Sequence, residues 1–211
     1  MTSPQQRLYL ITPRLADPAG FVPALETALG AGDVAAVLVR LDDADERTLI
    51  NRIKALSPAV QRRDVALILD GHPELAARAG ADGAHLFGVE AFAAALALLK
   101  PDRIAGAGGL RSRHDAMLAA ENGADYVMFG EPGRFTPDGR RAPFDETVER
   151  LTWWAELFEI PCVGYAAGVD EIAALGHTGA DFLALGEWIW NAPQGAAKAI
   201  AAAAEQLTAP A

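Results

Sequence analysis

Hydrophobic and polar positions divide the chain into two kinds of segment that alternate from one end to the other. Short apolar runs rich in Val, Ile, Leu, Phe and Ala are typical of parallel strands that are buried on both faces. These runs lie at 7–12, 34–40, 64–70, 83–88, 103–109, 126–131, 162–167 and 182–187. The segments between them have a helical pattern, and many end in glycine, which readily takes the left-handed conformation that closes a helix. The pattern predicts eight βα units.

The number and spacing of these units favour a closed barrel. With 211 residues, each of eight units has about 26 residues, which fits a small (β/α)₈ barrel closed by a last helix at 192–207. A doubly wound open sheet would alternate in the same way, but the even spacing and the lack of any break in composition favour closure. We therefore predict an α/β protein with a single TIM-barrel domain over residues 1–211.

A short repeat supports this topology. Gly-Ala-Asp occurs at 80–82, 123–125 and 179–181, each time between a helix and the next strand. The glycine can cap the helix in the left-handed conformation, and the aspartate then lies in the turn before the strand. In a barrel this is the face opposite the active site, where repeated residues contribute to stability. We expect the three aspartates to be structural.

Composition and charge exclude several classes of protein. The net charge of −10 and the lack of a Lys/Arg cluster argue against a nucleic-acid surface. Cys162 is the single cysteine, so no disulfide forms within the chain. No basic start precedes the short apolar run at 7–12, and no run is long enough to span a membrane. We expect a cytoplasmic protein that acts on a small molecule, with a homodimer as the default assembly.

Charged residues at the predicted strand ends are the first candidates for chemistry. Arg40, Asp70, Glu131 and Glu187 each end an apolar run, at the barrel face where active sites form. A charge in such a place needs solvent, a partner or a ligand. Two interpretations remain open: the arginine pairs with the acids across the barrel mouth, or it binds an anion.

The segment 70–74 has both a structural and a functional interpretation. Gly71 or His72 can cap the following helix, Pro73 suits its first turn, and Glu74 suits the positive end of its dipole. Asp70 is not explained in this way, so we expect it to bind metal or substrate. His72 is a further candidate ligand or base.

Two loops are candidates for contact with an anionic ligand. The glycine-rich segment 106–109 lets the backbone approach a ligand and can cradle a phosphate with its N–H groups. The polar loop 131–141 carries Arg134, Arg140 and Arg141 and is either a substrate clamp or a solvated loop.

The segment after the last predicted strand argues against phosphate binding. Glu187 lies where many barrels bind phosphate on a short helix. A carboxylate there would satisfy the helix amides itself and repel phosphate. Trp188 and Trp190 either line a pocket or pack against neighbouring elements.

Several segments together resemble one family. They are LYLIT at 8–12, LAARAGADGAHL at 75–86, AMLAAENGADYVMFG at 116–130, IPCVGY at 160–165 and TGADFLALG at 178–186. In their order and spacing the chain resembles the thiamine phosphate synthases and the related thiazole tautomerases over essentially its whole length. The resemblance implies a TIM barrel that joins hydroxymethylpyrimidine diphosphate to thiazole phosphate, with Mg²⁺ helping pyrophosphate to leave.

The resemblance also implies roles for individual residues. Arg40 would contact pyrophosphate, and Asp70 and Glu90 would hold Mg²⁺. The other positions that match substrate-binding positions of the family are His72, Gly109, Arg134, Thr136, Ala166, Ala167, Gly186 and Glu187.

The matching positions depart from the family in one direction. Asp42 stands where a lysine is usual, Gly71 replaces a magnesium aspartate, and Glu187 replaces a serine. Each close like charge would weaken the binding of a phosphorylated substrate by about 1 kcal/mol or more. Two other functions therefore remain open. One is an isomerase or lyase on a related thiazole or pyrimidine with Glu131 as general base. The other is a non-catalytic binder of thiamine or a similar cation.

Overall fold

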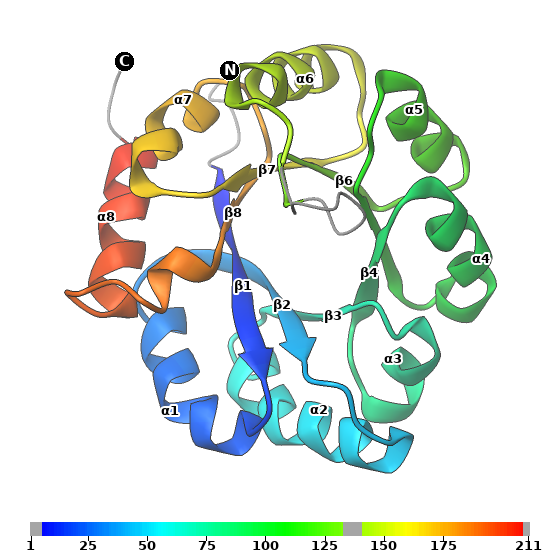
Figure 1. Ribbon diagram of the computed structural model, residues 1–211, viewed down its shortest axis with the longest axis vertical. Helices are drawn as coiled ribbons and strands as arrows, with labels where there is room; N and C mark the ends of the chain where they lie inside the picture. The colour runs from blue at the N-terminus through cyan, green and yellow to red at the C-terminus, as the bar shows by residue number, and fades with distance from the viewer. Residues whose placement is uncertain (1–5, 133–140, 209–211) are drawn as a thin grey trace.

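The computed structural model describes residues 6–132 and 141–208, and these form one closed barrel of eight parallel strands in the order β1 to β8 (Figure 1). The strands are β1 (Arg7–Leu15), β2 (Val34–Leu41), β3 (Ala66–Asp70), β4 (Gly83–Phe87), β5 (Ile104–Gly108), β6 (Tyr126–Phe129), β7 (Cys162–Ala166) and β8 (Phe182–Leu185). The predicted TIM barrel is confirmed.

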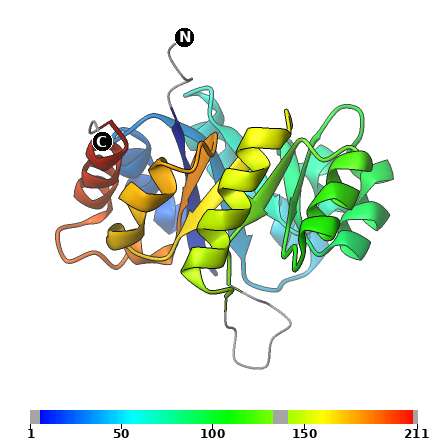
Figure 2. The ribbon, with the colours of Figure 1, turned by 90° about the horizontal axis from the view of Figure 1, so that it is seen from above.

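Helices surround the strands and cover their outer face. They are α1 (Pro18–Leu29), α2 (Glu46–Gln61), α3 (Pro73–Ala79), α4 (Val89–Leu99), α5 (Arg113–Glu121), α6 (Phe144–Leu157), α7 (Ile172–Gly176) and α8 (Ala196–Thr208), with short 3₁₀ helices η1 (Val169–Glu171) and η2 (Glu187–Ile189). The view from above shows α6, in yellow, alongside the central strands (Figure 2). The last helix starts four residues later than the predicted 192. Among the residues described, no helix is long and apolar enough to cross a membrane.

Two apolar layers hold the barrel together. The larger lies between strands and helices and includes Leu67, Phe92 and Trp154, all fully buried. The smaller fills the barrel interior and includes Tyr9 and Leu38. Successive side chains of a strand point to opposite faces, so polar residues two positions beyond an interior residue also face inward. This register places polar side chains at the end of the barrel interior where the strands have their C-termini.

Two predicted strands extend two residues too far at their C-terminal ends. The strand predicted at 126–131 ends at Phe129, and the one predicted at 182–187 ends at Leu185. After Phe129 the chain leaves the sheet at Gly130, which has a positive φ of 88°. Glu131 and Glu187 therefore stand in the loops above the strands, still at the mouth of the barrel.

The Gly-Ala-Asp repeat has the predicted structural role. Each aspartate Oδ2 accepts the backbone N–H of a residue at the start of the preceding strand or just inside it: Asp82 from Leu67 at 2.7 Å, Asp125 from Ala105 at 2.7 Å, and Asp181 from Cys162 at 2.9 Å. The three glycines all have positive φ. The repeat therefore ties each turn to the neighbouring strand at the face opposite the mouth.

Candidate active site

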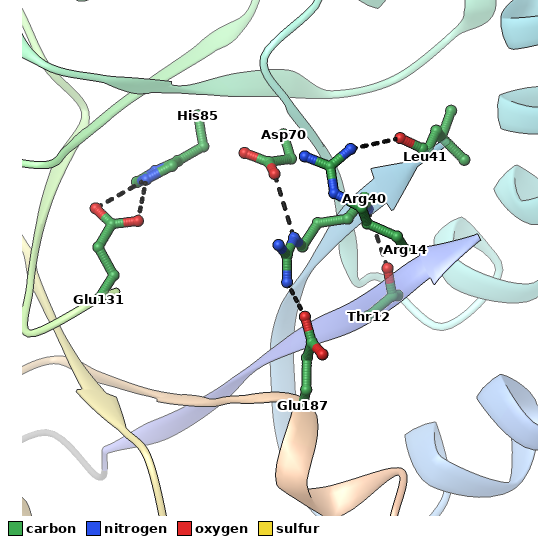
Figure 3. Close-up of polar contacts among 8 residues, drawn as sticks. All are labelled: Thr12, Arg14, Arg40, Leu41, Asp70, His85, Glu131 and Glu187. Atoms are coloured by element: carbon green, nitrogen blue, oxygen red, sulfur yellow. Dashed lines mark hydrogen bonds and ion pairs between the residues drawn. The ribbon is translucent and has the colours of Figure 1, made fainter. Parts of the chain in front are cut away.

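Two polar clusters stand at the mouth of the barrel (Figure 3). The arginine cluster consists of Arg40, Asp70 and Glu187, and the histidine cluster of His85, Glu131, Tyr126 and Tyr9. Figure 3 shows Arg40 between its two acids, with His85 and Glu131 facing each other nearby.

In the arginine cluster, one guanidinium contacts two carboxylates. Arg40 Nε lies 3.4 Å from Asp70 Oδ2, and its Nη1 donates to Glu187 Oε1. The Arg40 backbone N–H donates to Thr12 Oγ1 at 3.0 Å. The Asp70 side chain is only 3% exposed, whereas that of Glu187 is 47% exposed. Asp70 is thus the fixed partner of Arg40, and Glu187 is the partner that can exchange with solvent. Of the two open interpretations, pairing across the mouth is the one observed.

The predicted role of Glu187 as a cap of its own helix is wrong. The cap position of η2 is Gly186, and no side chain caps it. The Glu187 carboxylate pairs with Arg40 instead, because a guanidinium is a stronger partner than the amides of one short turn. The neighbouring tryptophans pack: Trp188 Nε1 donates to the Ala166 carbonyl at 3.1 Å, and Trp190 Nε1 to the Ile11 carbonyl at 2.7 Å.

The histidine cluster is a chain of hydrogen bonds inside the barrel. The hydroxyls of Tyr9 and Tyr126 are 2.8 Å apart, and Tyr126 Oη lies 3.0 Å from His85 Nδ1. His85 Nε2 lies 3.3 Å from Glu131 Oε2 and 3.4 Å from Oε1. Glu131 Oε1 also accepts the Gly109 N–H at 2.6 Å. The Glu131 side chain is 10% exposed and that of His85 is fully buried.

The His85 tautomer determines the direction of these hydrogen bonds. Burial raises the pKa of Tyr9 and that of Tyr126, so both hydroxyls keep their protons. One arrangement then uses every donor: Tyr9 donates to Tyr126, Tyr126 donates to Nδ1, and the Nε2–H of His85 donates to Glu131. The chain therefore runs from the barrel interior toward the Glu131 carboxylate.

Two glycines of β5 make room for this cluster. A Cβ at Gly106 would overlap the Tyr126 ring, and one at Gly108 would overlap both His85 and the Glu131 carboxylate. The glycine-rich segment predicted to cradle a phosphate instead surrounds a carboxylate of the chain, since the Gly109 N–H donates to Glu131.

The two clusters share one mouth. Burial raises the pKa of Tyr165 on β7, Glu187 and Glu131 raise it further, and Arg40 and Arg141 oppose them. Charges from both clusters therefore act on the same hydroxyl. An ionic substrate group that enters the mouth is exposed to both.

A cavity of about 610 Å³ opens beside Glu131 at the ends of β4, β5 and β6. Its apolar wall includes Phe87, Leu110 and Met128, and its polar lining includes Glu90, Arg111, Glu131, Arg141, Thr147 and Arg150. Its volume is in the range typical of sites for small molecules.

Some candidates from the sequence lie apart from the two clusters. His72 is in the left-handed conformation with φ of 53°, and its Nδ1 lies 3.5 Å from Glu74 Oε1, both side chains being exposed. Gly186 N donates to the Ala166 carbonyl at 3.3 Å, and this hydrogen bond links the ends of β7 and β8. Arg134, Thr136 and Arg140 lie outside the described residues.

Glu171 holds two further groups that were expected to contact substrate. The Ala167 N–H donates to Glu171 Oε2 at 2.8 Å. Arg141 donates two hydrogen bonds of 2.9 Å to the same carboxylate. An anionic substrate group would therefore have to compete with Glu171 for both donors.

The residues predicted to bind metal are Asp70 and Glu90. Mg²⁺ prefers oxygen ligands and takes many of them from substrate phosphates and water. In the ranges described, no group of three or more His, Cys, Asp or Glu side chains could hold a metal ion. Glu90 faces the cavity, whereas Asp70 is paired with Arg40. The donor set fits Mg²⁺ only in part.

Sequence reasoning missed His85 and Tyr126. Both lie in apolar runs that predict strands, and neither ends a strand. A signal was present for His85: it lies two positions before Phe87 in β4, on the face that reaches the cavity. Arg111 and Arg150 were also missed, because neither lies at a strand end.

Comparisons with known proteins agree with this architecture. A family model described as thiamine monophosphate synthase matches residues 8–189. A thiamine-phosphate synthase of Rhodospirillum centenum is 46% identical over 198 residues, covering 92% of this chain and 94% of that protein. One from Hyphomonas neptunium is 37% identical, covering 94% and 92%. The solved structure of thiamine phosphate pyrophosphorylase from Pyrococcus furiosus is similar with a TM-score of 0.77 and 25% identity, covering 98% of each chain.

Proposed function

Because this chain belongs to the thiamine monophosphate synthase family, we propose that it joins hydroxymethylpyrimidine diphosphate to thiazole phosphate and releases pyrophosphate. The observation that carries the proposal is the 46% identity to a thiamine-phosphate synthase over 92% of the chain. The structure adds a cavity of suitable size at the barrel face where such sites form.

In this reaction the thiazole nitrogen provides the electron pair for a new bond to the methylene carbon of the pyrimidine. The bond from that carbon to the diphosphate oxygen breaks, and its electron pair leaves with pyrophosphate. Arg40 is the proposed contact for the diphosphate. Its partner Glu187 is half exposed and can swing into solvent, while the buried Asp70 keeps the guanidinium in place.

A magnesium ion, when bound, would neutralise charge on the diphosphate as it leaves. The residues proposed to hold it are Asp70 and Glu90. Glu90 lines the cavity and can take this role as the structure stands. Asp70 fits this role less well, because its Oδ2 lies 3.4 Å from Arg40 Nε and its carboxylate keeps that guanidinium in place.

We propose a cytoplasmic location, where phosphorylated small molecules are available as substrates, and a homodimer as the assembly. The proposal of a dimer starts from three exposed apolar side chains, Leu98 on α4, Met117 on α5 and Leu157 on α6, which a second copy would cover. Light scattering during gel filtration measures the mass directly, and a mass near 22.2 kDa would show a monomer.

The first test is formation of thiamine phosphate by the purified protein, supplied with both substrates and Mg²⁺. We expect steady turnover in the native protein. In Asp70→Asn we expect a loss of at least tenfold in kcat/KM, because the neutral amide cannot balance the charge of the Arg40 guanidinium beside it. Product no higher than in a protein-free blank would remove the synthase assignment.

The contact between Glu131 and His85 favours one second candidate, an isomerase or lyase with Glu131 as general base. A base needs a carboxylate that reaches the ligand, and Glu131 borders the cavity. Incorporation of deuterium from heavy water into an unphosphorylated thiazole would support this second function, provided that the incorporation is lost in Glu131→Gln. Tight binding of thiamine without turnover would instead support the binder.

A further inference from the structure

The Glu131 carboxylate is held rigidly but retains free acceptor capacity. The Gly109 N–H binds Oε1 at 2.6 Å, and His85 Nε2 lies 3.3 Å from Oε2. The two oxygens of a carboxylate offer about four acceptor positions, so these two donors leave room for a third. The exposed part of the side chain borders the cavity of about 610 Å³. A ligand in the cavity therefore meets a fixed hydrogen-bond acceptor.

The surroundings of Glu131 limit which ligand group fits there. Phe87, Leu110 and Met128 form an apolar wall, which suits a flat ring. A carboxylate repels phosphate and attracts an N–H donor or a cationic group. Arg111 and Arg150 line the same cavity and suit an anionic group. The cavity thus complements an amino-substituted ring that carries an anionic substituent.

We propose that Glu131 binds the amino group of the pyrimidine ring of the donor substrate and so determines specificity for that ring. The inference rests on the proposed function, because the donor of that reaction combines an amino-substituted ring with a diphosphate. The diphosphate is then directed away from Glu131 and toward the arginines, namely Arg111 and Arg150 in the cavity and Arg40 at the barrel mouth. Glu131 accepts the Gly109 N–H and so prevents phosphate from binding there. In this proposal the same carboxylate orients the substrate.

The same contact assists bond breaking. When the carbon–oxygen bond to the diphosphate breaks, the electron pair leaves with pyrophosphate and positive charge develops on the pyrimidine methylene and ring. The thiazole nitrogen pair then forms the carbon–nitrogen bond, and the positive charge passes from the pyrimidine to the thiazolium ring of the product. A carboxylate already fixed by two donors stabilises such charge without reorganising. His85 does not reach the cavity and acts through Glu131, so it is a positioning residue.

The test is a comparison of two rings without phosphate, measured by calorimetry. The first is the aminopyrimidine alcohol, and the second is the same ring with hydrogen in place of the amino group. We expect the native protein to bind the amino ring at least tenfold more tightly. In Glu131→Gln, where the amide can still accept from Gly109, we expect this preference to fall below threefold. Glu149→Gln removes an exposed acid on α6 as the matched control, and it should keep the native preference.

Equal preference in Glu131→Gln and the native protein would overturn the inference, as would failure of the amino ring to bind the native protein. If circular dichroism shows that Glu131→Gln does not fold, Glu131→Asp replaces it, because its shorter carboxylate withdraws from the ring. There the preference should fall at least threefold, and an unchanged preference would again overturn the inference. This binding measurement does not require turnover. If the native protein is inactive but its preference for the amino ring is lost in Glu131→Gln, the synthase assignment is refuted and the role of Glu131 is retained.

Discussion

Glycine 108 determines how closely His85 and Glu131 can approach each other. We predict that Gly108→Ala forces the two side chains apart and destabilises the protein by about 1–3 kcal/mol, the usual cost of overpacking an interior. Urea unfolding measures the loss, and the ring preference described above should fall in parallel.

A second glycine provides the control for this substitution. Gly30 has an ordinary φ of −82°, and the nearest atom to an added Cβ lies 3.6 Å away. Gly30→Ala should therefore change the free energy of unfolding little. If both variants were equally stable, crowding around Gly108 would not be what holds Glu131 in place.

At this scale the sequence predicted part of the site. Arg40, Asp70 and Glu187 end apolar runs, so their position at the mouth followed from the pattern alone, and their mutual contact is one of the two outcomes it allowed. His85 was not identified because a single polar residue within a strand has no period of its own. Its partner Glu131 lies in the loop after β6, two strands further round the barrel, and only the pairing of β4, β5 and β6 brings the two together.

Among the elements, the turns before β4, β6 and β8 carry the aspartates that fasten neighbouring strands. We predict that Asp82→Ala costs about 1–3 kcal/mol of stability, because the Leu67 N–H loses its acceptor and the Gln61 side chain loses one of its two. Asp82→Asn keeps an oxygen at that place and should cost less. Both effects are read from urea unfolding curves.

The same substitution separates stability from activity. Asp82 lies at the face of the barrel opposite the mouth, so kcat/KM of folded Asp82→Ala should equal that of the native protein. A clear fall in kcat/KM under conditions where the variant is folded would mean that this face influences the site. The sequence predicted these turns well because three copies of one motif repeat a local rule. It predicted strand ends less well, since the chain leaves the sheet only where pairing with a neighbouring strand stops.

For the whole molecule, burial of ionisable groups predicts a loss of stability in alkali. Burial raises the pKa of the Cys162 thiol to about 12 and also raises that of the interior tyrosines. The folded protein thus keeps protons that the unfolded chain releases above its ordinary values, near pH 9 for the thiol and pH 10 for tyrosine. Stability is fully present below about pH 8 and falls as pH rises through this range.

The expected slope reaches about 1.4 kcal/mol per group for each pH unit above its unfolded pKa. Urea unfolding at pH 8 and pH 10.5 measures it. Tyr9→Phe removes one of these groups and should unfold with a shallower dependence on pH. Equal unfolding free energies of the native protein at the two pH values would contradict the prediction.

The overall architecture was the most predictable part of the molecule. Eight βα units of even length favour a closed sheet, in which the last strand pairs with the first, as β8 does with β1. The assembly was less predictable, because the sequence does not show which outward-facing apolar side chains a second subunit buries. Leu157 on α6 is 66% exposed in the single chain.

The close fit of Gly106 and Gly108 against their neighbours also limits the order in which this sequence can change. A side chain at 108 is tolerated only after both Glu131 and His85 have been replaced by smaller residues, and one at 106 only after Tyr126 has been. Each such pair is coupled, so the cost of one substitution depends on whether the other has occurred. Mutational paths that begin at the glycine pass through a poorly folded intermediate, whereas paths that begin at its larger partner do not. The histidine cluster can therefore be lost in steps, but it is rebuilt only by a return to glycine first.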